Sequence, residues 1–218
     1  PVLKVEKTTD KPFYKYGDII TYRIALTQEQ TGCVARNVTL QDVIDTQGVR
    51  LLKDSVILMD EKGNVADADV QINDDNTFLM STGRTLVRDS RYSICDNDKG
   101  GLFEQIMYNP LDCQEQKSMI VEYQAAVIDA ALAGQKVHNT AVADSSEKIP
   151  ATGETETEVH SPILEIVKES DKKEYASGEK GYYKLTVRQL REDVTDQNIV
   201  IEDKLETQGA SIVKAAFL

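Results

Sequence analysis

Three polar side chains, Lys7, Asp42 and Asn139, could react with one another if the fold buries them side by side. Each occupies a position in an alternating apolar run where the side chain should point into a core. An unpaired ammonium or carboxylate is costly to bury, so such groups are neutralised, paired or chemically consumed. An amine beside a carboxyl group and a carboxamide has the components for amide-bond formation with loss of ammonia.

Burial of these three groups leaves three outcomes open. In the first, burial lowers the pKa of Lys7 and raises the pKa of Asp42, so that a neutral amine attacks the Asn139 carboxamide. Protonated Asp42 then polarises the carboxamide oxygen and shuttles a proton, and an isopeptide bond remains after ammonia leaves. In the second, Lys7 and Asp42 form a buried salt bridge with Asn139 as a hydrogen-bond partner. In the third, the strand ends lie near the surface and Lys7 extends into water.

Short β-strands must position these residues. Turn sequences such as KYGD and EKGN separate runs with period-2 alternation that are rich in Val, Ile, Thr and Tyr, and helical periodicity is weak. The runs occupy residues 2–7, 18–27, 36–44, 55–61, 118–129 and 136–144. Many short strands at this spacing predict an all-β fold, with immunoglobulin-like β-sandwich repeats in tandem.

The chain contains an internal repeat. Residues 1–57 align without a gap with residues 162–218, and NVTLQDVIDTQG in the first copy corresponds to NIVIEDKLETQG in the second. Two of the three polar positions recur in the second copy, as the pairs Lys7/Lys168 and Asp42/Asp203. The inward carboxylate is therefore a feature of the repeat and not an accident of one strand.

The repeat defines the predicted domain organisation. A complete repeat spans residues 1–148, with a more polar insertion at about residues 60–116. A polar linker rich in Thr and Glu follows at residues 149–161, and residues 162–218 are the first part of a second, truncated repeat. Because the chain begins with proline and stops within a strand-like run, we expect it to be a piece of a longer protein.

Motifs in this order resemble a known family. P-x-L-x-x-x-K, YxxGDxITYxI, NVTLQDxI and VHNTAVAD are similar to the conserved repeat of bacterial surface proteins called domain of unknown function eleven. That repeat is related in architecture to the immunoglobulin-like domains of collagen adhesins. The resemblance implies a stalk of tandem repeats in a secreted or wall-anchored protein on a Gram-positive-type cell surface. It also implies, by position, an isopeptide bond between Lys7 and Asn139 assisted by Asp42.

Two functions fit these observations. The first is a structural stalk or spacer repeat of an adhesin or pilin-like protein, whose partners are neighbouring repeats of the same chain. The alternative is an adhesive module that uses the insertion at about residues 60–116 to bind a host or cell-wall ligand. We do not expect an enzyme, since the sequence has no GxSxG elbow, phosphate loop or GxGxxG.

Composition narrows the partners. A net charge of -12 argues against nucleic acid, which is bound through Lys and Arg. No apolar run approaches the roughly 20 residues that cross a bilayer, so no membrane insertion is predicted for this fragment. No cofactor or metal is predicted, because the acidic stretch DNDKGG lacks the spacing of a calcium-binding loop.

The cysteines leave the redox state open. Cys95 and Cys113 flank a glycine-containing loop and could form a disulfide if the protein is exported, whereas buried reduced thiols are the alternative. Cys33 would be left over in either case.

Overall fold

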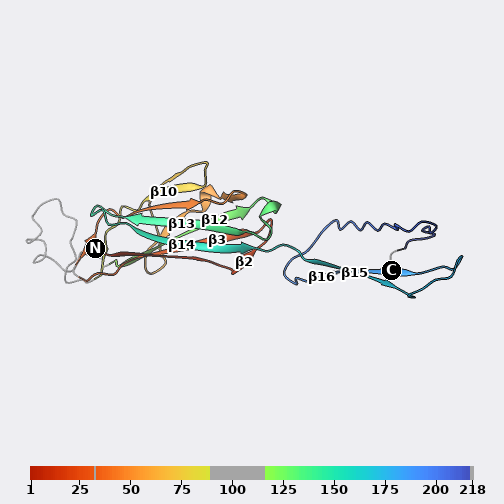
Figure 1. Ribbon diagram of the computed structural model, residues 1–218. Helices are drawn as coiled ribbons and strands as arrows, with labels where there is room; N and C mark the ends of the chain where they lie inside the picture. Colours follow the sequence, from red (N-terminus) through yellow and green to blue (C-terminus); the bar gives the residue numbers. More distant parts are fainter. Residues whose placement is uncertain (32, 89–115, 217–218) are drawn as a thin grey trace, which may run out of the picture. The chain divides into compact units, whose positions relative to one another are not determined.

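The computed structural model describes residues 1–31, 33–88 and 116–216. Contacts along the chain divide it into two compact units, Pro1–Ser161 and Pro162–Leu218 (Figure 1). The first unit contains two six-stranded sheets, and the second contains one two-stranded sheet.

The first sheet of the first unit has the strand order β1-β3-β12-β7-β8, with β6 also paired to β12. Its central pairings are antiparallel, and Lys7 on β1 lies opposite Ile24 on β3. Its strands are β1 (Leu3–Thr9), β3 (Ile19–Gln28), β6 (Val49–Leu51), β7 (Ile57–Met59), β8 (Val65–Ala66) and β12 (Ser118–Val127).

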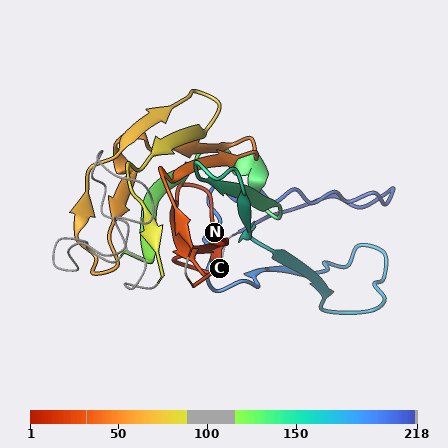
Figure 2. The same ribbon diagram turned by 90° about the vertical axis from the view of Figure 1, so that its left-hand side faces the viewer.

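The second sheet has the order β2-β14-β13-β5-β10-β9, and only the β2–β14 pairing is parallel. In Figure 2 its edge strand β9 and neighbour β10 appear in gold at the rim of the first unit. Its strands are β2 (Phe13–Tyr14), β5 (Thr39–Ile44), β9 (Asp69–Ile72), β10 (Thr77–Ser81), β13 (Lys136–Asp144) and β14 (Ala151–Val159). The remaining elements of the unit are β4 (Val34–Ala35), β11 (Leu86–Val87) and the 3-10 turns η1 (Lys53–Ser55) and η3 (Ala130–Leu132).

One hydrophobic core joins the two sheets. Alternation along each strand turns every second side chain inward, and the inward residues of both sheets belong to a single buried cluster. The first sheet contributes Ile24 and Val121, for example, and the second contributes Leu40 and Val137. The predicted fold class, an all-β immunoglobulin-like sandwich, is confirmed for the first unit.

The linker predicted at residues 149–161 is wrong over most of its length. Ala151–Val159 form strand β14, which pairs with β13 from end to end. Its outward face is rich in Glu and faces solvent, whereas its inward positions include Gly153 and Thr157. Small or polar residues at inward positions give a weak apolar signal, so the composition resembled a linker although the segment is a strand.

The predicted insertion at residues 60–116 is also wrong in its first half. Residues 60–88 include strands β8 to β11, which pair with other strands of the unit. Phe78 and Met80 of β10 are fully buried in the core. The Cys95–Cys113 disulfide and the rest of the insertion fall outside the described residues, and Cys33 is a half-buried free thiol.

The second unit contains the antiparallel pair β15 (Leu164–Ser170) and β16 (Tyr183–Gln189). Its local contacts match those of the first unit at aligned positions. The Gln28 side-chain oxygen accepts a hydrogen bond from the Val2 N–H at 3.0 Å, and the Gln189 oxygen accepts one from the Ile163 N–H at 3.0 Å. The aligned residues thus build the same local structure twice.

Candidate functional site

Strand β1 carries Lys7 into the core of the first unit. Leu3 and Val5 precede it on the same buried face, and the Lys7 side chain itself is 0% exposed. This burial rules out the alternative in which Lys7 extends into water. The two buried alternatives, the salt bridge and the covalent bond, place the amine where the structure has it.

Adjacent strands of the opposite sheet carry Asp42 and Asn139. On β5, Asp42 lies opposite Ala141 of β13, so Asn139 is its diagonal neighbour on the same inward face. Both residues are 0% exposed. Lys7 of the first sheet therefore meets an acid and a carboxamide of the second sheet across the core.

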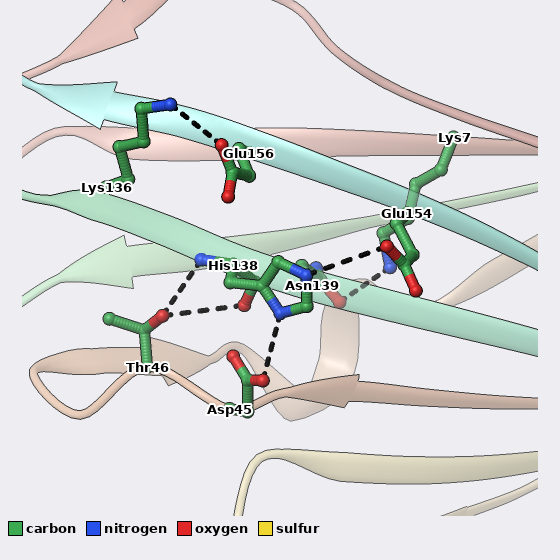
Figure 3. Close-up of polar contacts among 8 residues, drawn as sticks. All are labelled: Lys7, Asp45, Thr46, Lys136, His138, Asn139, Glu154 and Glu156. Carbon is green, nitrogen blue, oxygen red and sulfur yellow. Dashed lines mark hydrogen bonds and ion pairs between the residues drawn. The ribbon is translucent and has the colours of Figure 1, made fainter.

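The Lys7 ammonium group has three donors and finds three acceptors. Its Nζ donates to the Asn139 Oδ1 at 2.6 Å, to the Tyr123 hydroxyl at 3.1 Å, and to Asp42 Oδ2. Figure 3 shows Lys7 and Asn139 pointing toward each other from opposite strands. The amine thus lies in contact with the carboxamide that it would have to attack.

Tyr123 of β12 completes the site, and the sequence analysis did not single it out. Its hydroxyl donates to Asp42 Oδ1 at 2.6 Å and accepts from Asn139 Nδ2 at 2.6 Å, in addition to the Lys7 contact. The ring stacks on Tyr22 and meets Phe78 edge-on, each with centroids 5.1 Å apart. The signal that could have found Tyr123 is its inward parity in the predicted strand at residues 118–129.

The electrostatics of the site favour neutral groups. Loss of hydration lowers the pKa of Lys7 to about 8, although the Asp42 charge acts in the opposite direction. Burial likewise raises the pKa of Asp42, against the opposing effect of Lys7. Both shifts favour transfer of a proton from the ammonium to the carboxylate, which leaves a nucleophilic amine next to a carboxylic acid.

The arrangement of Asp42 differs from the one predicted. The sequence analysis placed its carboxyl group on the carboxamide oxygen of Asn139, whereas its hydrogen bonds go to Lys7 and Tyr123. The carboxamide is held by Lys7 at its oxygen and by Tyr123 at its nitrogen. Asp42 is placed to take a proton from Lys7, and Tyr123 occupies the position on the carboxamide nitrogen.

The opposite face of β13 carries a separate, exposed polar cluster (Figure 3). His138 Nδ1 lies 2.9 Å from Asp45 Oδ2, and Lys136 Nζ donates to Glu156 at 2.8 Å. The contact with Asp45 raises the pKa of His138. In the part of the chain that the structure describes, no three His, Cys, Asp or Glu side chains converge as metal ligands would.

In the second unit, Lys168 and Asp203 form the equivalent pair. Lys168 Nζ lies 2.7 Å and 2.9 Å from the two carboxylate oxygens of Asp203. Their side chains are 39% and 37% exposed, in contrast to the buried pair of the first unit. The aligned residues therefore meet in both units, but they are sequestered from water in one.

Two further predictions concern parts of the chain that do not meet at this site. The ligand-binding alternative depends largely on residues 89–115, which lie outside the described residues. Over the described ranges, the structure contains no helix with the length and apolar character required to cross a membrane.

The sequence matches no protein-family model and no curated protein. Solved structures that it resembles include the collagen-binding domain of a Staphylococcus aureus adhesin, at 10% identity and TM-score 0.41, covering 72% of this chain and 99% of that one. Two others are pilins. BcpA, the major pilin subunit of Bacillus cereus, is 9% identical with TM-score 0.44, covering 75% of this chain and 41% of that one. The major pilin SpaD of Corynebacterium diphtheriae is 14% identical with TM-score 0.44, covering 76% and 36%. The chain spans less than half the length of either pilin.

Proposed function

We propose that this chain is a structural stalk or spacer segment of a bacterial cell-surface protein, in which an autocatalytic isopeptide bond joins Lys7 to Asn139. The observation that carries the proposal is the buried contact between the Lys7 amine and the Asn139 carboxamide, 2.6 Å apart at the oxygen. A site of this kind acts once per molecule during folding and has no turnover. Its product is a covalent link within the domain.

The chemistry begins with proton transfer from Lys7 to Asp42, which the two pKa shifts favour. The neutral amine then attacks Cγ of Asn139, the carbon that bears the contacted oxygen. Fixed proximity of nucleophile and electrophile in a dry core replaces the activation that a solution reaction would require. Ammonia leaves and an amide remains, so no buried ion pair persists in the product.

The position of the bond supports a mechanical role. Lys7 lies on β1 of the first sheet, and Asn139 lies on β13 of the second. A covalent link between them would tie the two sheets together near the N-terminus and near the end of the unit. Pulling force that enters at β1 would then leave through β13 and β14 without passing through the strands between them.

The repeat supports a stalk of several such units. The aligned second unit forms the same local contacts, including its own Lys168–Asp203 pair. Neighbouring repeats of the same chain are therefore the expected partners. Because mechanical load and covalent hardening are demands of proteins outside the cell, we place the parent protein at the cell surface or wall of a Gram-positive-type bacterium.

The intact mass of the 218-residue chain tests this proposal. After thiol reduction, the wild-type protein should lack the mass of one ammonia, and a tryptic peptide should contain Lys7 linked to Asn139. Lys7→Ala and Asn139→Ala should each restore the full calculated mass. Lys4→Ala is the matched control, because Lys4 lies on the same strand but is exposed and paired with Glu6.

Asp42→Ala should also restore the full mass, since the Lys7 ammonium loses its proton acceptor. A wild-type protein that is folded and has the full calculated mass would exclude the covalent bond and leave the buried salt bridge as the state of the site.

A further inference from the structure

We propose that Tyr123 is a catalytic residue of bond formation, whose hydroxyl relays a proton from the attacking Lys7 nitrogen to the departing Asn139 nitrogen. This inference rests on the proposed function, because it describes one step of the same reaction. It assigns a role to a residue that the sequence motifs do not include.

The reaction requires two proton transfers. The first converts the Lys7 ammonium to an amine, and Asp42 Oδ2 accepts that proton. After attack, the former Lys7 nitrogen carries a positive charge and a surplus proton, while the carboxamide nitrogen must gain a proton before it can leave as ammonia. A second group must therefore connect the two nitrogens.

Tyr123 lies between these two atoms. Its hydroxyl oxygen is 3.1 Å from Lys7 Nζ and 2.6 Å from Asn139 Nδ2, and both nitrogens donate to it in the unreacted site. Once the carboxamide carbon becomes tetrahedral, Nδ2 gains a basic lone pair and can accept the phenolic proton. The same oxygen can then take the surplus proton from the Lys7 nitrogen.

Asp42 is poorly suited to the second transfer. Its oxygens are directed at Lys7 and Tyr123, and it already holds the first proton when the second must move. Bulk water is excluded as well, since Lys7, Asp42, Tyr123 and Asn139 are all buried and their hydrogen bonds are made to one another. The hydroxyl is the one group in contact with all three other members of the site.

A tyrosine suits a relay that exchanges protons without forming a phenolate. Burial and the neighbouring Asp42 charge raise the pKa of Tyr123 well above its ordinary value, so the hydroxyl remains protonated before and after the step. In a concerted exchange the phenol gains one proton as it gives up another. No charge develops on the ring in the apolar core.

The atoms balance over the whole sequence. Lys7 passes one proton to Asp42, and its amine lone pair forms a bond to Cγ of Asn139 while the carbonyl electron pair moves to Oδ1. The Lys7 nitrogen passes a second proton to Tyr123 as Tyr123 passes its own to Nδ2. The carbonyl re-forms, and the C–N bond breaks with its electron pair on the departing ammonia. The products are the amide, ammonia and protonated Asp42.

The test compares Tyr123→Phe with wild type in the full chain. Each protein is isolated unfolded, refolded by dilution, and sampled by intact mass over time. The ring contacts with Tyr22 and Phe78 remain in the variant, so it should fold with a wild-type circular dichroism spectrum. We expect ammonia loss to slow by roughly 100-fold or more, the usual contribution of a positioned acid or base. Tyr14→Phe is the control, because it also removes a buried hydroxyl that donates to a carboxylate, at 2.5 Å to Asp10.

A pH series separates a relay from a positioning role. If Tyr123 only orients Asp42, the variant fails to deprotonate Lys7, and its rate should recover above pH 8, where the amine becomes neutral without help. If Tyr123 protonates the leaving group, the defect should persist in alkaline solution. Recovery at high pH would overturn the relay, as would a folded Tyr123→Phe protein that reacts at the wild-type rate.

The same data distinguish failure of the relay from failure of the proposed function. A wild-type protein with no ammonia loss overturns both, since there is then no reaction to catalyse. Ammonia loss in wild type and Tyr14→Phe with equally rapid loss in Tyr123→Phe overturns only the relay. If Tyr123→Phe does not fold, the pH dependence of the wild-type rate in heavy and light water replaces it, and absence of a solvent isotope effect at any pH would count against proton relay.

Discussion

A covalent link between Lys7 and Asn139 should fix how far the first unit can be stretched. Force applied at the chain termini would pass along residues 1–7, cross the bond, and continue from residue 139 to the end of the unit. The intervening 132 residue steps between Lys7 and Asn139 would be bypassed. Unfolding of the linked unit should therefore release only its two short end segments.

The expected difference follows from chain geometry. A stretched polypeptide spans about 3.3–3.6 Å per residue, so the bypassed segment corresponds to roughly 450 Å of contour length. The two end segments of the linked unit together provide only about 100 Å. Single-molecule stretching of the full chain from its termini should show this additional length in Lys7→Ala and not in wild type.

Contour length is the decisive readout because it does not depend on stability. Lys7→Ala leaves Asp42 buried without its cation, which costs about 3–5 kcal/mol and lowers the unfolding force by itself. Such a loss changes the force but cannot change the length of chain released. The exposed-face control Lys4→Ala should behave as wild type, and equal contour lengths for wild type and Lys7→Ala would refute the mechanical reasoning.

Three further outcomes are expected. Asn139→Ala should lower the melting temperature by about 10–20 °C in calorimetry, because closing a loop of this size contributes roughly 5 kcal/mol; a shift no larger than that of Lys4→Ala would argue against a crosslink. Gly153→Ala should destabilise the first unit by about 1–3 kcal/mol in urea titrations and slow ammonia loss, since a Cβ there would lie 2.7 Å from the Val5 side chain, on the strand that carries Lys7. The outward-facing Glu154→Ala should have neither effect. In the unreacted Asn139→Ala protein, Lys7 has a folded pKa of about 8 against 10.5 ordinarily, so the folded state binds fewer protons and stability should rise between those pH values. The linked wild-type protein has no such amine, and an equal pH dependence in both would contradict this assignment.

The inward positions of the site could be predicted from sequence because strand parity is local. Lys7, Asp42 and Asn139 each continue a run of buried alternate residues, and the structure buries all three. Their meeting could be inferred only through the family resemblance. It depends on β13 pairing with β5 and on one sheet packing over the other, which no local pattern specifies.

Tyr123 and strand β14 were missed for different physical reasons. An inward tyrosine is an ordinary core residue, and the role of its hydroxyl depends on three partners from three other strands. Strand β14 lacks a strong apolar signal because Gly153 occupies an inward position. That glycine is required there, since β1 approaches so closely that a side chain would collide with Val5. The composition that looked like a linker reflects this close approach.

The two units separate what the first third of the repeat provides from what a complete sandwich provides. Residues aligned between the units form the same ion pair, Lys7 with Asp42 and Lys168 with Asp203, so the nucleophile and its proton acceptor come from the aligned segment. The carboxamide and the relay hydroxyl come from β13 and β12, which are far along the chain. Under the proposed chemistry, the bond can form only after the last strands have closed over the first, because the electrophile and the relay arrive with them. The bond would therefore form last, and it would lock a fold that is already complete.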